Sequence, residues 1–206
     1  MTLTHFAIIA VCAYLLGSLS FAIIVSKLTL GKDIRNYGSG NAGLTNSYRT
    51  MGAKKTLLVL LGDIAKGAAA VSIGMVLAGP VGKLTAGIFV ILGHMFPLYF
   101  GFKGGKGVLV GAGAALATEP LVCAALLVIF LIEVAITRIV SLGSIIIAAL
   151  YPVGTLINLI ACGANLPTIV FSTVCCAIMA AMVIWLHRSN IERLKNGTEY
   201  RFGEKK

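Results

Sequence analysis

The sequence predicts an all-α, polytopic membrane protein with about seven transmembrane helices, at least one of them short. Of the 206 residues, 58% are hydrophobic and only 12% are charged, whereas a soluble domain carries roughly 25% charged residues. Apolar runs with few charged residues recur at the length that crosses a bilayer. The basic residues gather in a few segments between these runs. Composition therefore disfavours the alternative, a soluble helical bundle.

The first apolar run covers residues 6–26. We interpret it as a retained span, because a signal peptide would begin with a positive segment and this run does not. The further runs are 56–79, 84–100, 107–118, 120–137 and 139–186. The last has 48 residues, interrupted at Pro152 and at 163–167. It predicts two spans with a tight turn, since one span needs about 20 residues.

The basic residues fix the predicted topology. They cluster at 27–55, at 103–106, at Arg138 and at 188–206, and the positive-inside rule places such clusters in the cytoplasm. An even number of spans must then separate each pair of clusters. Run 107–118 therefore has to cross as a short helix that turns at Glu119–Pro120. This predicts seven crossings in a cell (inner or plasma) membrane, with the N-terminus out and the C-terminus in. By length, residues 1–206 form a single transmembrane domain.

Glycines stand at the start of the predicted short helix, at Gly104, Gly105 and Gly107. A helix start leaves backbone N–H groups without partners, and these groups bind anions together with the helix dipole. We therefore expect the N–H groups of these glycines to be available to a phosphate.

Residues 32–49 read KDIRNYGSGNAGLTNSYR and are too polar for a span. Residues 38–43 match the dinucleotide fingerprint, but no strand precedes them, so we reject that interpretation. Glycines still let a backbone approach an anion closely, and Arg35 and Arg49 can supply bidentate charge. The short side-chain donors expected here belong to Ser39, Asn41, Thr45 and Asn46. A solvated loop that obeys the positive-inside rule is the plainer alternative.

Two further polar segments follow. Residues 101–107 place Lys103 and Lys106 among four glycines at a membrane boundary, which makes a compact cationic site but no Walker A motif. His94, just upstream, is expected to be a helix-packing histidine. Residues 187–199 begin where the last span ends, and His187 and Asn190 share a helix face. For this last segment an amphipathic tail is the alternative.

The five cysteines all lie within apolar runs: Cys12, Cys123, Cys162, Cys175 and Cys176. With no CxxC pair and no nearby histidine, they are predicted to be small buried apolar residues. We predict no metal site and no cofactor.

Three stretches together resemble one family: DIRNYGSGNAGLTNSYR (33–49), GHMFPLYFGFKGGKGV (93–108) and HRSNIERLKNGTE (187–199). Their order and spacing are similar to those of the bacterial membrane glycerol-3-phosphate acyltransferases that use acyl phosphate as donor (PlsY-type). The resemblance in length and span pattern covers essentially the whole chain. One departure is Leu109-Val110, where many members have Ala-Thr. It puts in doubt any hydroxyl role at that place.

The resemblance implies acyl transfer from acyl phosphate to the sn-1 hydroxyl of glycerol 3-phosphate at the cytoplasmic face, with lysophosphatidate and phosphate as products. It implies that glycerol 3-phosphate is held by Ser39, Arg49, Lys106, His187 and Asn190. It implies that acyl phosphate is cradled by Gly40, Asn41, Thr45, Asn46, Gly104, Gly105, Ser141 and Ser144, with Lys103 serving either substrate. Among these, Lys106, His187, Ser39 and Asn190 are the expected catalytic residues. Both substrates and membrane lipid are the expected partners, and nucleic acid is not; the oligomeric state stays open.

A small transporter or channel for a phosphate-bearing anion is the alternative from another class. Transporters usually bind at the bilayer midplane between internal repeats, and here no repeat is found and the polar segments collect at one interface. The intramembrane charges are Asp63, Lys66 and Glu133, which are functional candidates by default. We expect Asp63 and Lys66 to pair at i,i+3.

Overall fold

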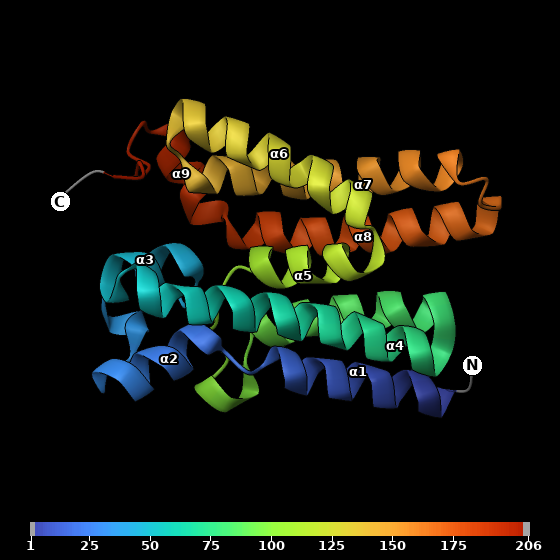
Figure 1. Ribbon diagram of the computed structural model, residues 1–206, viewed down its shortest axis with the longest axis horizontal. Coiled ribbons are helices and arrows are strands. Elements are labelled where there is room, and N and C mark those ends of the chain that lie inside the picture. Colours follow the sequence, from blue (N-terminus) through green and yellow to red (C-terminus); the bar gives the residue numbers. More distant parts are fainter. Residues whose placement is uncertain (1–2, 204–206) are drawn as a thin grey trace. The chain divides into compact units, whose positions relative to one another are not determined.

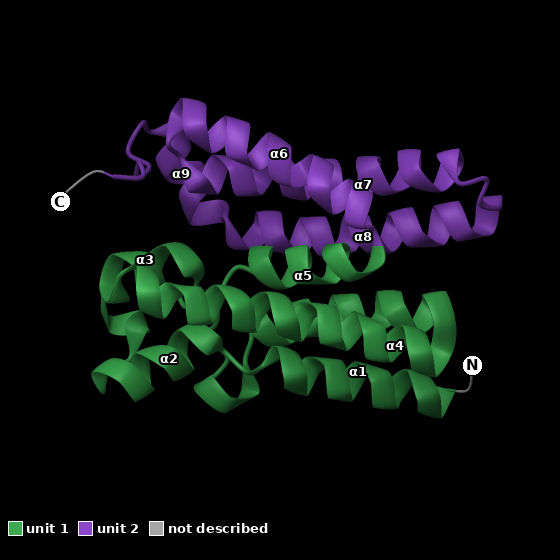
Figure 2. Cartoon of the chain, viewed as in Figure 1, with its two compact units in different colours: residues 1–118 green, residues 119–206 purple. Residues whose placement is uncertain are grey.

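The computed structural model describes residues 3–203, and helices are the only regular elements within that range. The predicted all-α class is confirmed. By contacts the chain divides into two compact units, residues 1–118 and residues 119–206 (Figure 2). Each unit is described by itself.

Unit 1 holds the following elements in chain order (Figure 1): α1 (Leu3–Gly17), α2 (Phe21–Leu30), η1 (Ile34–Asn36), α3 (Leu44–Met51), α4 (Ala53–Met95), η2 (Leu98–Phe100) and α5 (Val108–Thr118). Unit 2 holds α6 (Pro120–Thr137), α7 (Val140–Ala161), α8 (Leu166–Leu186) and α9 (Arg188–Lys195).

Five helical stretches of the described chain are long and apolar enough to cross a membrane: Leu3–Leu30, Ala53–Phe100, Pro120–Thr137, Val140–Ala161 and Leu166–Leu186. Large apolar side chains on them stay exposed, such as Val76 at 86%, Leu121 at 78% and Ile136 at 77%. Exposed apolar surface of this extent is unfavourable in water and suited to lipid. The helices therefore match a membrane environment, with lipid on their outer faces.

Helix α4 reverses direction within its length. Ala78 and Gly79 depart from helical geometry, with φ of −150° and 60°, and Pro80 follows. Lys66 Nζ lies 3.0 Å from His94 Nδ1 although 28 residues separate them, whereas a straight helix would place them about 42 Å apart at 1.5 Å per residue. The two predicted runs 56–79 and 84–100 are thus antiparallel helical segments that pack side by side.

The predicted first span, 6–26, is not one continuous helix. α1 ends at Gly17 and α2 begins at Phe21, with Ser20 in an extended conformation (φ −84°, ψ 99°). Leu98 N donates to Ser18 Oγ at 3.3 Å in this break. Apolar periodicity carries no sign of such a break, because a span needs only apolar residues while a helix end needs partners for its backbone.

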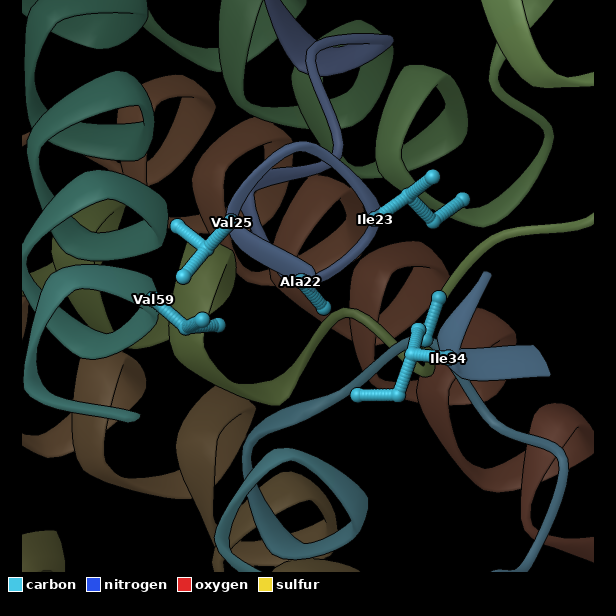
Figure 3. Packing of buried hydrophobic residues seen from close by; sticks show 6 residues of the cluster. Ala22, Ile23, Val25, Ile34 and Val59 are labelled. Carbon is cyan, nitrogen blue, oxygen red and sulfur yellow. The ribbon is translucent and has the colours of Figure 1, made fainter. Parts of the chain in front are cut away.

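A buried apolar cluster fastens the glycine-rich loop to the helices of unit 1. Ala22, Ile23 and Val25 of α2 and Val59 of α4 meet Ile34 of η1, and all five are at most 7% exposed (Figure 3). Ala42, fully buried, completes the cluster. The loop is therefore anchored at both its ends by apolar side chains.

Helices α4 and α5 approach each other through glycines. A Cβ atom at Gly67 would lie 2.2 Å from the carbonyl oxygen of Val110, and one at Gly113 would lie 2.1 Å from that of Ile64. Small residues that allow close backbone contact are typical of packed membrane helices. The short run 107–118, predicted to be a separate helix ending at Glu119–Pro120, is confirmed as α5.

In unit 2, α6 packs on α7 and α7 on α8. The predicted turn at 163–167 is confirmed: Gly163 adopts φ 67° and Asn165 caps α8 by accepting from Thr168 N at 3.0 Å. Pro152, by contrast, lies inside α7 without ending it, because a membrane helix tolerates proline where neighbours satisfy the freed carbonyl. The prediction that all cysteines are buried is confirmed for Cys175 and Cys176 only: Cys12 and Cys162 are exposed, and Cys123 is half-buried.

Candidate functional site

The loop between α2 and α3 is held in shape by Asn46, a residue of α3 that is only 2% exposed. Its Nδ2 donates to the carbonyls of Ile34, Tyr37 and Asn41 at 3.2, 3.0 and 2.9 Å. Its Oδ1 accepts from the N–H of Ser39 at 2.9 Å. Both polar atoms of the side chain are thus occupied within the loop. This geometry gives Asn46 a structural role in place of the predicted direct contact with a ligand.

Glycine is required where this loop turns. Gly38 adopts φ 59°, and a Cβ there would lie 2.2 Å from Asn46 Oδ1. Gly40 adopts φ 72°. Left-handed backbone of this kind costs other residues free energy. The glycines therefore let the loop close around the Asn46 amide, with Ser39 and Gly40 left on the exposed side.

Arg35 ties this loop to the second polar segment. Its Nε and Nη2 bind the carboxylate of Asp33 at 3.0 and 2.8 Å, and its Nη1 donates to the carbonyls of Phe100 and Lys103 at 2.5 and 3.1 Å. The hydrogen bonds from Arg35 hold the pKa of Asp33 below its usual value of 3.8. The prediction that Arg35 offers its guanidinium to an anion is wrong, because all three nitrogens already donate within the protein.

Gly104 and Gly105 lie against the end of α4. Their N–H groups donate to the carbonyls of Met95 and His94 at 3.2 and 3.1 Å. The expectation that these two N–H groups are free for phosphate is therefore wrong. A Cβ at Gly105 would lie 2.2 Å from His94 Nε2 and 2.7 Å from the carbonyl oxygen of Ala42. The glycines serve close packing against His94 and the first loop, and they set the course of the chain into Lys106.

Two polar segments of unit 1, 33–49 and 101–107, are thus brought together. Of the predicted site residues in these segments, Ser39, Gly40, Arg49 and Lys103 are exposed, and Asn41, Thr45 and Lys106 are half-buried. The exposed surface of these segments is rich in cations and hydroxyl groups, which is the chemistry that binds phosphate.

His187 stands at the junction of α8 and α9 and is 3% exposed. Its Nδ1 lies 2.8 Å from the carbonyl oxygen of Val183. A carbonyl only accepts, so Nδ1 carries the hydrogen, and Nε2 is the acceptor atom of the neutral ring. The backbone of its own helix therefore fixes which nitrogen of His187 can receive a proton.

Glu199 collects several polar groups of unit 2, and sequence reasoning gave it no role. Its Oε1 accepts from Ser141 Oγ at 2.9 Å and from Asn190 Nδ2 at 2.6 Å, and its Oε2 accepts from Arg193 Nε at 2.7 Å. The structure thus brings Ser141 and Asn190, two predicted site residues, to one buried carboxylate. Ser144, also buried, donates its hydroxyl to the carbonyl of Val140 in its own helix at 2.8 Å.

Burial opposes ionisation of Glu199, but the hydrogen bonds from Asn190, Ser141 and Arg193 outweigh it and hold its pKa below the usual value of 4.5. A lowered folded-state pKa means that the ionised carboxylate stabilises the fold above about pH 4.5. The contribution is lost as the pH falls through the folded-state pKa. At pH 7 we expect Glu199→Gln to destabilise the protein by about 1.5–3 kcal/mol, the range for hydrogen bonds to charged groups.

Thermal unfolding in detergent measures this effect. The difference in Tm between wild type and Glu199→Gln is expected to be largest near neutral pH and to shrink below about pH 4.5. Glu192→Gln, which changes an exposed carboxylate on the neighbouring helix α9, is the control and should leave Tm unchanged. Equal effects of the two substitutions at all pH values would contradict the assignment.

Residues 7–197 of the chain match the model of the glycerol-3-phosphate acyltransferase family. A glycerol-3-phosphate acyltransferase of Clostridioides difficile is 43% identical over 212 aligned positions, covering 100% of both chains. One of Geobacillus kaustophilus is 40% identical over 193 positions, covering 94% of each chain.

Two solved structures are also similar. Both are crystal structures of PlsY (YgiH), an integral membrane glycerol 3-phosphate acyltransferase. Its glycerol 3-phosphate form gives a TM-score of 0.83 at 36% identity and covers 96% of each chain. Its lysophosphatidic acid form gives a TM-score of 0.82 at 34% identity, covering 96% of this chain and 95% of the other.

Proposed function

Since the chain belongs to the glycerol-3-phosphate acyltransferase family, we propose that it transfers a fatty acyl group from acyl phosphate to the sn-1 hydroxyl of glycerol 3-phosphate. The products are 1-acylglycerol 3-phosphate (lysophosphatidate) and inorganic phosphate, at the first acylation of phospholipid synthesis. The names of the relatives support the acceptor, and the lysophosphatidic acid form of one solved relative supports the product.

The observation that carries this proposal is the pair of polar segments in unit 1. Arg35 joins them by donating to the carbonyls of Phe100 and Lys103, and their accessible surface presents Arg49, Lys103 and hydroxyl groups. Cations and hydroxyls placed beside apolar helices suit a substrate pair in which both members carry phosphate and one carries a lipid chain.

Acyl phosphate is already activated, so the transfer needs no covalent enzyme intermediate. The sn-1 hydroxyl oxygen attacks the acyl carbon, the bond from that carbon to the phosphate oxygen breaks, and phosphate leaves. Holding the two reactants together contributes about 7–11 kcal/mol, and cations at the developing charge contribute more. The hydroxyl proton passes to Nε2 of His187 or to a phosphate oxygen of a substrate.

The proposed roles follow the family pattern. The residues that we propose to bind glycerol 3-phosphate are Ser39, Arg49, Lys106, His187 and Asn190. Those proposed for acyl phosphate are Gly40, Asn41 and Thr45, with Lys103 serving either substrate. Asn46, Gly104, Gly105, Ser141 and Ser144 keep a place in the proposal as residues that shape the site, because their polar groups bond within their own units.

We also propose the topology of seven crossings, with the N-terminus outside, the C-terminus inside and the site facing the cytoplasm. The reversal within α4 and the separate short helix α5 support the number of crossings. The basic segments support the orientation. A single transmembrane domain is supported by the family match, which runs through both compact units.

Purified protein tests the function through phosphate release. We expect release, together with lysophosphatidate, only when acyl phosphate and glycerol 3-phosphate are both present, and acyl-CoA in place of acyl phosphate tests the donor. Absence of both products would contradict the proposal. Counterflow of labelled glycerol 3-phosphate in liposomes without acyl phosphate would instead favour the transporter alternative.

A further inference from the structure

Three titratable side chains meet in the buried interior of unit 1. Lys66 Nζ lies 2.8 Å from Asp63 Oδ1 and 3.0 Å from His94 Nδ1. The three residues are at most 3% exposed. The predicted i,i+3 pair of Asp63 and Lys66 is confirmed, and His94 belongs to the same cluster. Charged groups inside a membrane are costly, so a specific arrangement has to stabilise them.

The ion pair stabilises both sides of the break between α1 and α2. Lys66 Nζ donates to the carbonyls of Gly17 at 3.1 Å and Leu19 at 2.6 Å, and Asp63 accepts from the N–H of Phe21. A helix end leaves carbonyls without partners and a helix start leaves N–H groups without partners. The cation thus lies at the end of α1 and the anion at the start of α2, as the helix dipoles favour.

The Lys66 ammonium lies within hydrogen-bond distance of four atoms. It donates to Gly17 O and Leu19 O, and its other two neighbours are Asp63 Oδ1 at 2.8 Å and His94 Nδ1 at 3.0 Å. An ammonium has donors only. His94 Nδ1 must therefore be an acceptor, which fixes its ring in the neutral form with the hydrogen on Nε2.

His94 in turn supports the segment that carries Lys106. Its carbonyl accepts from Gly105 N at 3.1 Å, and its Nε2 faces Gly105 so closely that a Cβ there would lie 2.2 Å away. The orientation of the imidazole therefore sets the distance between α4 and the Gly104–Lys106 backbone. Ala42, at the end of the first loop, borders the same contact.

We propose that Lys66 is a positioning residue for the acyl transfer. Its ammonium holds His94 in the neutral ring form that supports the Gly104–Lys106 segment. Asp63 neutralises the charge and joins this arrangement to the α1–α2 break. The inference rests on the proposed function for its kinetic consequence. The Asp63–Lys66 ion pair is enough to stabilise the break between α1 and α2, so the contact of Lys66 with His94 calls for a separate explanation.

The test compares two substitutions of His94. Asparagine places an acceptor near the position of Nδ1 and keeps the partner of Lys66, whereas glutamine places its polar atoms near Nε2 and loses that partner. We expect His94→Gln and Lys66→Met to lower kcat by about 100-fold, the size expected for a misplacement of about 1 Å. His94→Asn should retain kcat within about tenfold of wild type. Equal kcat values for His94→Asn and His94→Gln would overturn the proposal.

A second measurement is independent of turnover. The chain has three histidines, so ¹⁵N-histidine labelling gives a simple spectrum. Wild type should show the signal of an unprotonated, hydrogen-bonded Nδ1 for His94. The signal is assigned to His94 by its loss in His94→Asn. Lys66→Met should shift it to the position of a nitrogen without a hydrogen bond. A signal unchanged by Lys66→Met would overturn the proposal. If Lys66→Met does not fold, the His94 pair decides alone.

Lys54→Met is the matched control, because it removes an exposed lysine from the same helix α4. It should change neither kcat nor the His94 signal. A wild-type protein that releases no phosphate would contradict the proposed function, whereas the histidine spectrum would still report on the arrangement at Lys66.

Discussion

Replacing Lys106 by methionine is expected to lower kcat/KM for acyl transfer by about 10³-fold. Lys106 follows the Gly104-Gly105 pair, whose N–H groups bond to the end of α4, so its backbone is fixed while its side chain stays half-buried. Removing one preorganised donor from a site of developing charge costs about 10²–10³-fold in kcat, and loss of phosphate binding adds an increase in KM. Arg49→Ala should act in the same direction.

Steady-state phosphate release at varied glycerol 3-phosphate separates the two effects. Lys54→Met serves again as the control for loss of one lysine, and Tm in detergent checks the fold. A Lys106→Met variant with wild-type kcat and KM would remove Lys106 from the proposed catalytic residues.

Replacing Gly105 by alanine is expected to abolish most activity with a smaller effect on unfolding. The new Cβ would lie 2.2 Å from His94 Nε2 and 2.7 Å from the carbonyl oxygen of Ala42. Such contacts force neighbouring atoms to move, and overpacking of this kind costs typically 1–3 kcal/mol. The backbone that carries Lys106 should be displaced, which is expected to lower kcat/KM by about 100-fold.

Gly111→Ala is the matched control. Gly111 lies on α5, the helix that follows Gly105 in the chain. Its added Cβ would meet only Ile91 Cδ1 at 3.7 Å, an ordinary contact. Activity and Tm should stay close to wild type. Equal activity of the Gly105 and Gly111 variants would contradict the close packing described around His94.

The sequence identified the two polar segments that the structure brings together in unit 1, but it predicted the wrong role for several of their residues. Asn46 and Arg35 were expected to face a ligand, because amide and guanidinium groups in a glycine-rich loop can bind phosphate. In the structure Asn46 binds the loop's own backbone and Arg35 binds the carbonyls of the neighbouring segment. A polar side chain serves a ligand or the fold depending on which partners fold beside it, and residue type does not reveal those partners.

Glu199 is a residue of the opposite kind, because the sequence predicted no role for it and the structure gives it several partners. It lies at the end of the polar segment 187–199, and its spacing from Asn190 gave no reason to single it out. The one feature of the sequence that could have pointed to it is that it is a carboxylate in a basic tail. Only the turn after α9 brings it to Asn190, Ser141 and Arg193, and Ser141 is 58 residues away along the chain.

The sequence by itself determined the membrane class, the short helix predicted at 107–118 and the polar segments from which the proposed site is built, because these depend on composition, run length and charge. Only the tertiary structure decided that α1 and α2 are separate helices and that Asp63 and Lys66 cap the break between them. It also decided that His94 links this cluster to Gly105. Those contacts depend on which backbone groups of a broken helix find partners, and the partners come from residues up to 49 positions away.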